Sequence, residues 1–274
     1  MYLKRYTYLL LCFLLSINCL FSQGEIETLR LPDNYNENTI GLRLTSNGYG
    51  IDYRFSQRIS HRLRNFYEAE YNIIKNSKEI KVVNPFVEAI SLKRFVFGKT
   101  HFVSNLKLGF GLDRMFFEKR DKNSISIHLS GSIGGILAIS KPIYYEIVDS
   151  VTDIDNARIY HTSYRQVDVH MQNNPTDIVS RAPFTYGLDE IKLHPGFYIK
   201  AAVAFDFSKE PLKTKVLETG IAFDYYLTPF EIMAGQSHIS LFTIYLAYRF
   251  GNKYDARIHR EARRWERKQN RSNL

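Results

Sequence analysis

Residues 240–250 read Ser-Leu-Phe-Thr-Ile-Tyr-Leu-Ala-Tyr-Arg-Phe. Successive side chains of a β-strand point to opposite faces, so this stretch presents two different faces. One face is wholly apolar and ends in aromatic residues, whereas the other includes Thr243 and Arg249. Such a pattern is typical of a transmembrane β-barrel, in which every second residue meets lipid. The stretch therefore predicts the last strand of a barrel.

Residues 1–22 have the features of a signal peptide. Lys4 and Arg5 form a basic start, an apolar core follows over residues 9–21, and a small residue stands at Ser22. We expect cleavage after Ser22 and export of the remaining chain. Both cysteines of the chain lie inside this leader, so the exported protein is predicted to hold neither a disulfide nor a thiolate metal site.

Alternating apolar and polar residues recur between the leader and the last strand. Residues 39–45 and 49–55 flank Asn47-Gly48, a strong two-residue hairpin signal. No run of about 20 apolar residues, as a transmembrane helix needs, follows residue 22. The sequence predicts an all-β fold, a closed antiparallel transmembrane barrel over residues 39–251, preceded by a polar periplasmic lead-in over 23–38.

The strand number depends on the stretch 124–148, which alternates for longer than the about 9–11 residues that cross a membrane. Gly134-Gly135 and Lys141-Pro142 offer places for a turn, and we expect a break between about 135 and 141. With a further strand over 87–97 this predicts ten strands, with eight as the alternative. A long outer loop then spans 149–191, and the C-terminal end lies in the periplasm.

The more polar face of the predicted strands collects five basic and seven acidic residues. An interior of eight to ten strands is just wide enough to be filled by side chains, so we expect these charges to pair inside the lumen. The predicted network consists of Arg43, Asp52, Arg54, Glu68, Glu70, Lys107, Asp113, Lys200, Asp206, Glu218, Asp224 and Arg249.

Three alternatives remain open for the site. An incompletely filled lumen would be a narrow channel for ions or small solutes. Ser126 and His128 share the lumen phase with Ser130, and a serine with a histidine and a carboxylate is the minimum for acyl transfer on a lipid or polysaccharide. The outer loop holds five possible metal ligands, which are Asp149, Asp153, Asp155, His161 and His170. They do not follow a recognisable ligand spacing, so no metal or cofactor is predicted.

Residues 252–274 form a basic tail. Between Lys253 and Arg271 there are eight Lys or Arg residues against three acidic ones, a large part of the net charge of +9. The spacing of the few apolar residues predicts a helix with a weak apolar stripe. We expect this tail to bind an envelope partner rather than nucleic acid, through Arg257, Arg260, Arg263, Arg264, Trp265 and Arg267.

Several further segments resemble known proteins. They are Phe97-Gly98-Lys99, Leu108-Gly109-Phe110-Gly111, residues 131–135 leading to 141–146, Lys192-Leu193-His194-Pro195-Gly196 and the terminal aromatic strand. Over nearly the whole mature length the chain resembles small outer-membrane β-barrel proteins of the Bacteroidetes type, a resemblance that implies a barrel but no particular activity. Such chains commonly stop at the terminal aromatic residue, whereas 24 residues follow Phe250 here.

Together these features predict a non-enzymatic protein of the bacterial outer membrane. We expect it to contact outer-membrane lipid and to serve as an accessory or anchoring subunit of a cell-envelope assembly, such as secretion or barrel-insertion machinery. Its protein partner is expected in the periplasm or the outer membrane and bound through the basic tail. The channel and the lipid- or polysaccharide-modifying enzyme stand as the alternatives.

Overall fold

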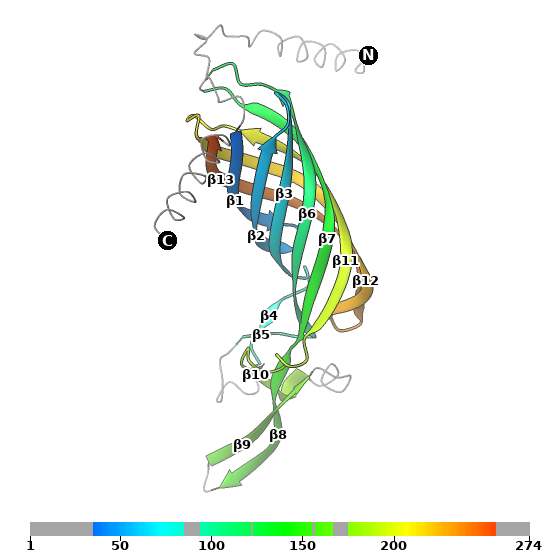
Figure 1. Ribbon diagram of the computed structural model, residues 1–274. Coiled ribbons are helices and arrows are strands. Elements are labelled where there is room, and N and C mark those ends of the chain that lie inside the picture. The colour runs from blue at the N-terminus through cyan, green and yellow to red at the C-terminus, as the bar shows by residue number, and fades with distance from the viewer. Residues whose placement is uncertain (1–34, 85–93, 122, 155–156, 167–174, 256–274) are drawn as a thin grey trace, which may run out of the picture.

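A computed structural model describes residues 35–84, 94–121, 123–154, 157–166 and 175–255. The predicted leader, most of the lead-in and the tail beyond Asp255 lie outside these residues. Eight strands close into an antiparallel barrel in the ring order β1-β13-β12-β11-β7-β6-β3-β2 (Figure 1). They are β1 (Tyr35–Thr45), β2 (Gly48–Arg58), β3 (Leu63–Ile74), β6 (His101–Phe117), β7 (Ser126–Pro142), β11 (Lys192–Asp206), β12 (Lys213–Met233) and β13 (Gln236–Asp255).

The ring is closed by the first and the last strand. β1 pairs with β13 from Tyr35 opposite Asp255 to Thr45 opposite Tyr245. The barrel thus begins four residues before the predicted start and ends four after the predicted end. Closure leaves no unpaired edge within the ring, which is the condition for a sheet to lie in hydrocarbon.

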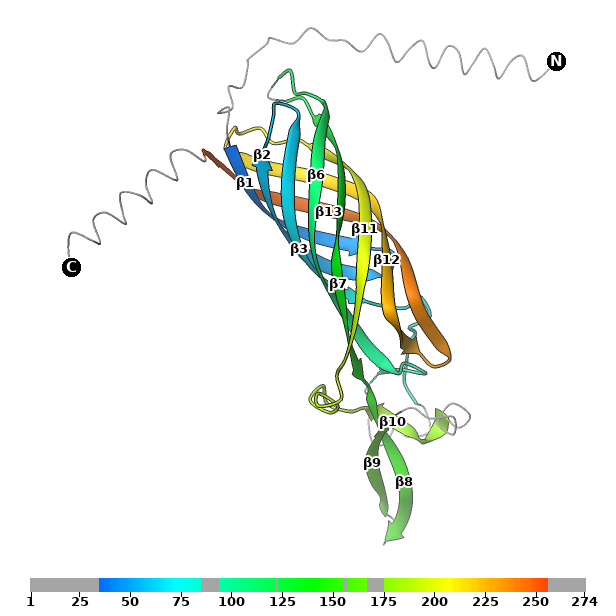
Figure 2. The same cartoon turned by 45° about the vertical axis from the view of Figure 1, so that its right-hand side comes forward.

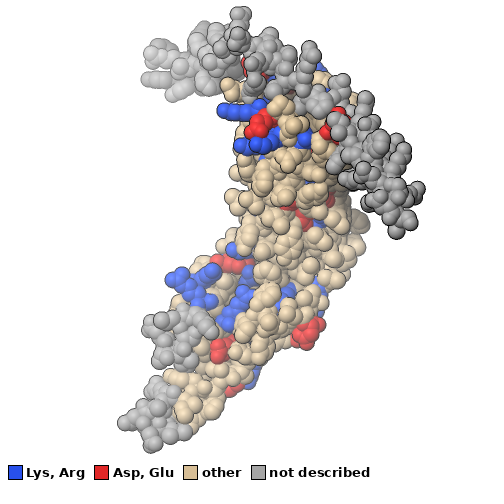
Figure 3. Space-filling model, turned by 60° about the vertical axis from the view of Figure 1, so that its left-hand side comes forward, with Lys and Arg blue, Asp and Glu red and all other residues tan. Residues whose placement is uncertain are grey.

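The alternation read from residues 240–250 is present in β13. The side chains of Thr243, Tyr245, Ala247 and Arg249 are turned inward and leave only 0–8% of each residue exposed. The intervening residues, from Phe242 to Phe250, are 40–57% exposed on the outer wall. On the face that Figure 3 shows, the middle of the barrel is covered mostly by uncharged residues.

The prediction of ten strands is wrong, and the alternative of eight is the observed number. β7 runs without a turn through Gly134-Gly135 and ends only at Pro142. The rule of about 9–11 residues describes the membrane crossing alone, whereas β7 has 17 residues and β12 has 21. Strands of that length extend beyond the crossing, so the excess alternation in 124–148 did not require a break.

The other predicted strand that is missing from the ring is 87–97. Residues 85–93 lie outside the described part of the chain. The remainder contributes β5 (Phe95–Val96), which pairs with β4 (Lys81–Val82) in a separate two-stranded sheet. Because two strands drop out together, the number stays even, and the start of β1 and the end of β13 still lie at one end of the barrel (Figures 1 and 2).

A small sheet projects from the opposite end of the barrel (Figure 2). Its strands are β8 (Tyr144–Ile154), β9 (Ala157–Gln166) and β10 (Ile178–Arg181), in the order β10-β8-β9, and a 3₁₀ turn over Pro175–Asp177 precedes β10. We call this sheet, together with β4 and β5, the outer extension. The predicted loop 149–191 is therefore largely folded where the structure describes it.

The connections differ at the two ends of the barrel. At the end where β1 begins and β13 ends, the connections 59–62, 118–125 and 207–212 are all short. At the opposite end the connections 46–47 and 234–235 are tight turns, whereas the connections 75–100 and 143–191 are long. We name the first the inner end and the second the outer end. None of the helices in the described residues is long and apolar enough to cross a membrane.

Candidate functional site

All twelve residues of the predicted lumen network are turned into the barrel. None of them is more than 6% exposed. Each lies within 4.0 Å of at least one side chain of opposite charge. The lumen is therefore filled by paired charges.

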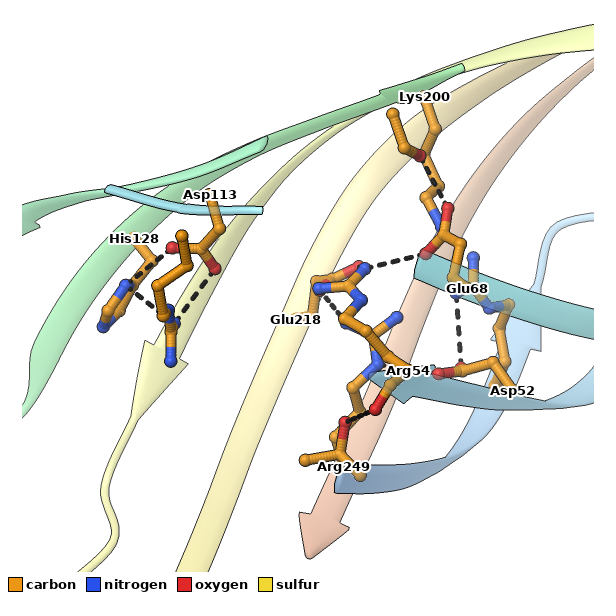
Figure 4. Close-up of polar contacts among 12 residues, drawn as sticks. Asp52, Arg54, Glu68, Asp113, His128, Lys200, Glu218 and Arg249 are labelled. Atoms are coloured by element: carbon orange, nitrogen blue, oxygen red, sulfur yellow. Dashed lines mark hydrogen bonds and ion pairs between the residues drawn. The ribbon is translucent and has the colours of Figure 1, made fainter. Parts of the chain in front are cut away.

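Glu218 on β12 is the centre of the network. Its Oε2 atom accepts two hydrogen bonds, one from Arg54 on β2 at 3.0 Å and one from Arg249 on β13 (Figure 4). Its other oxygen accepts from the hydroxyl of Tyr245 at 2.7 Å. The residue has no exposed surface, so this carboxylate replaces its water shell entirely with protein donors.

A second group of ion pairs lies next to Glu218. Lys200 on β11 contacts Glu68 at 2.7 Å and also pairs with Glu70, both on β3. Arg43 on β1 bridges Glu70 at 2.7 Å and Asp52 at 3.3 Å. Asp52 also pairs with Arg249 at 2.7 Å, and this pair joins the second group to the first.

The outer half of the lumen contains a third pair and a small cavity. Lys107 contacts Asp224 at 2.6 Å, from β6 to β12. The cavity measures about 20 Å³ and is lined in part by Arg43, Glu70 and Asn72. That volume holds about one water molecule. Each of these three residues also has a buried polar atom without a protein partner among the described residues, and one water would supply partners.

Four charged residues of the inner half were not predicted. Arg64 contacts Glu37 at 2.9 Å and Asp113 at 3.1 Å. Asp206 contacts Lys119 at 2.9 Å and Lys253 at 3.5 Å. Two of the four, Glu37 and Lys253, lie opposite each other in β1 and β13, just outside the predicted barrel limits of 39 and 251.

Aromatic rings complete the packing of the charges. Arg54 lies over the ring of Phe66, with its guanidinium carbon 3.9 Å from the ring centroid, and Arg43 lies over Tyr245 at 4.2 Å. A side chain at Gly111 would come within 2.2 Å of the Phe66 ring. The lumen position opposite Phe66 therefore requires glycine, which lets the ring lie flat against Arg54.

The residues of the acyl-transfer alternative come together at the inner end. Ser126 Oγ lies 3.1 Å from His128 Nε2. His128 Nδ1 lies 2.9 Å from Asp113 Oδ1, a contact that Figure 4 shows. Arg64 approaches the same Nδ1 at 3.1 Å. Ser126 and His128 are only 4% and 6% exposed. The order serine, histidine, aspartate is thus present, but it is buried and shares its aspartate with an arginine.

The outer extension packs onto the outer end of the barrel through a small apolar cluster. Its buried members are Phe95, Ile143, Tyr145, Ile147 and Ile178. The Tyr145 hydroxyl donates to the carbonyl oxygens of Val96 and Lys99 at 2.6 and 2.8 Å. Burial raises the pKa of this phenol, so Tyr145 stays protonated and keeps its donor role.

The predicted tail residues and the loop ligands have different outcomes. The tail from Arg257 to Arg267 lies outside the described residues, as do Asp155 and His170. Asp149 contacts Arg165 at 2.5 Å. Across the described residues, no group of three His, Cys, Asp or Glu side chains is arranged to hold a metal ion.

Comparison with known proteins finds only distant structural similarity. The chain matches no protein-family model and no curated protein. Similar solved structures are small outer-membrane proteins. The attachment invasion locus protein Ail of Yersinia pestis has a TM-score of 0.40 at 7% identity, covering 81% of this chain and 100% of that one. Neisserial surface protein A has a TM-score of 0.39 at 9% identity, with coverages of 82% and 99%. A major outer membrane protein of Thermus thermophilus has a TM-score of 0.38 at 9% identity, with coverages of 81% and 98%. At these values nothing about activity is transferred.

Proposed function

We propose that this protein is an outer-membrane anchor, a barrel with a filled lumen that serves as an accessory subunit of a cell-envelope assembly such as secretion or barrel-insertion machinery. The observation that carries this proposal is the complete pairing of the twelve lumen charges. A lumen occupied in this way leaves the two ends of the barrel to act on other molecules. These ends hold the outer extension and the basic tail.

Its location in the outer membrane is supported by the wall of the barrel. The ring has no open edge, and large apolar side chains such as Leu108, Ile199 and Ile244 are exposed on its outer wall, as hydrocarbon requires. Bacterial barrels have short periplasmic connections and longer outer loops, so the inner end belongs in the periplasm. The leader predicted at residues 1–22 fits this route, and the segments named above make the Bacteroidetes type our proposal for the family.

A purification experiment tests the anchor role. With an affinity tag in the outer extension, the full chain is expected to retain a periplasmic or membrane protein in mild detergent. A chain ending at Asp255 is expected to lose it, because the cationic tail is the proposed docking segment. The truncation must not be made earlier, since residues 252–255 of β13 pair with residues 35–38 of β1.

A full-length variant with a charge-neutral tail separates the effect of the tail's charge from the effect of its length. Changing Arg257, Arg260, Arg263, Arg264 and Arg267 to glutamine keeps every residue of the tail but removes five positive charges. We expect this variant to lose the partner as the truncation does, whereas Trp265→Ala alone would weaken retention if the ring is an anchor. The anchor role is excluded if the full chain is always recovered alone.

The channel alternative finds little support in the lumen. A conducting path would have to pass the ion pairs around Glu218, and the cavity beside Arg43 and Glu70 is only about 20 Å³.

An enzyme is the second candidate, because one specific observation favours it. The Ser126–His128–Asp113 distances of 3.1 and 2.9 Å would let His128 accept the serine proton while Asp113 orients the ring.

The acyl-transfer candidate predicts a covalent reaction with a fluorophosphonate, which labels activated serines. Wild-type protein would be labelled and Ser126→Ala would not, while Ser130→Ala is the control because Ser130 is equally buried on the same face of β7. The anchor proposal expects no labelling of either, because Ser126 is buried and Arg64 takes up the charge of Asp113. Labelling that depends on Ser126 would make the enzyme the better account.

A further inference from the structure

Lys141 is a buried cation without a carboxylate partner. It lies near the outer end of β7 and is 4% exposed. Its ammonium donates to the Pro142 carbonyl at 3.3 Å and lies 4.7 Å from the centroid of the Phe184 ring. No Asp or Glu side chain of the described residues is within 4.0 Å of it, in contrast to Lys107 and Lys200 in the lumen. An ammonium has three donors, so two of them have no protein acceptor in the described structure.

One further cation acts on Lys141. Arg181 ends β10 opposite Tyr145 of β8, and its positive charge acts on both Lys141 and Lys99. Arg181 is exposed and forms no ion pair within the described residues. Lys192 of β11 does not belong to this group, because it lies opposite Ser140 and therefore on the face of the sheet away from Lys141, where its charge acts on His101 and His194. Figure 3 shows Lys and Arg gathering over the outer end of the barrel, below its mostly uncharged middle.

The acidic residues near these cations are occupied elsewhere. Glu79 pairs with Lys99 at 2.6 Å, Glu190 accepts from Tyr144 and Gln166, and Glu146 accepts from Ser180 and Thr162. Burial lowers the pKa of Lys99, and the charge of Arg181 lowers it further. Glu190 and Glu146 accept from neutral donors and keep their negative charge, but neither forms an ion pair with Lys141 or Arg181 in the part of the chain that the structure describes.

Leaving a buried charge unpaired costs free energy that a bound anion would return. We propose that Lys141 and Arg181 form a phosphate-binding site at the outer end of the barrel, and that this site binds the headgroup of an anionic outer-leaflet lipid. A phosphate offers several acceptor oxygens, which suits an ammonium group and a guanidinium. The exposed ring of Phe184, packed edge-on against Phe102 at 5.9 Å, fits the aromatic girdle at a membrane surface.

The assignment of the phosphate to a lipid rests on the proposed function, in which the outer end of the barrel lies at the outer membrane surface. The existence of a phosphate-binding site does not depend on that orientation. The experiment therefore begins with reconstitution of the full chain into vesicles of phosphatidylcholine with a minor fraction of phosphatidic acid. Failure to enter any bilayer would overturn the proposed function. After mild extraction, native mass spectrometry would count the phosphatidic acid molecules that stay bound.

Wild-type protein is expected to retain phosphatidic acid over phosphatidylcholine by about tenfold, a free-energy difference of about 1.4 kcal/mol. The variant with Lys141→Gln and Arg181→Gln should lose this preference. The control carries Lys209→Gln and Lys215→Gln, the same change of charge at exposed positions of the inner end, and should keep it. Arg181 is exposed, so Arg181→Gln alone should fold even where Lys141→Gln does not. This single variant is also expected to weaken the preference.

A second arm identifies the source of the phosphate. Inorganic phosphate is added to lipid-free protein in a neutral detergent, and binding is followed by calorimetry. Binding that Lys141→Gln abolishes would keep the site but assign it to a soluble phosphate. The proposal is overturned if wild-type protein shows neither preference for phosphatidic acid nor binding of inorganic phosphate, or if the inner-end control loses both equally.

Discussion

Replacing Glu218 with alanine is expected to lower the free energy of unfolding by about 3–5 kcal/mol, the cost of removing one partner of a buried ion pair. The loss leaves both Arg54 and Arg249 without their shared carboxylate in a part of the lumen where Glu218 has no exposed surface. It also removes the acceptor of the Tyr245 hydroxyl. Unfolding by urea in lipid vesicles, followed by circular dichroism, measures the effect.

Two control variants test whether the loss of stability comes from the buried charge of Glu218. Glu118→Ala breaks an exposed pair with His61, and a surface pair contributes about 0–1 kcal/mol. Glu218→Gln keeps the shape and an acceptor but removes the charge, so it should fall between the wild type and Glu218→Ala. If Glu218→Ala is no less stable than Glu118→Ala, the lumen is hydrated and the paired network does not fill it.

The alternation of side chains was sufficient to identify the twelve lumen residues. Because a strand has a period of two, the choice of one face at Arg249 fixes the face of every residue in that strand. The same reasoning extends to Glu37 and Arg64, which lie in phase with Arg43 and Glu68. They were missed because the limits of the barrel and the list of charges were drawn too narrowly, not because the pattern failed.

Contacts between strands could not be read in this way. Lys119 reaches Asp206 from beyond the end of β6, after a register shift between Met115 and Phe117. The approach of Asp113 to His128 likewise depends on the register of β6 against β7. Periodicity along one strand excludes an offset that would turn the lumen residues outward, but it does not select among the offsets that keep them inside. The Ser126–His128–Asp113 arrangement therefore needed the structure.

The strand count failed for a physical reason of its own. A membrane sets the minimum length of a barrel strand but not the maximum, so alternation that continues past the bilayer looks like an extra strand. The residues after Pro142 do continue as a strand, but β8 leaves the ring and pairs with β9 and β10. Sequence periodicity describes both situations equally well, and only the pairing partners separate them.

Three single cysteines give an all-or-none test of the barrel and its orientation. The background carries Cys12→Ser and Cys19→Ser, which removes both native thiols. Thr185→Cys places a thiol beyond the outer end, Lys209→Cys places one in the connection 207–212 of the inner end, and both positions are exposed. Ile199→Cys replaces a 57% exposed residue in the middle of β11. None of the three lies in the lumen network.

The measurement is labelling of intact cells with a bulky, membrane-impermeant maleimide. We predict that Thr185→Cys is labelled in intact cells, that Lys209→Cys is labelled only after the outer membrane is permeabilised, and that Ile199→Cys is labelled only after lipid is removed by detergent and the protein unfolded. Labelling of Ile199→Cys in membranes would contradict the lipid-facing wall. Labelling of Lys209→Cys but not Thr185→Cys in intact cells would contradict the orientation on which the anchor role depends.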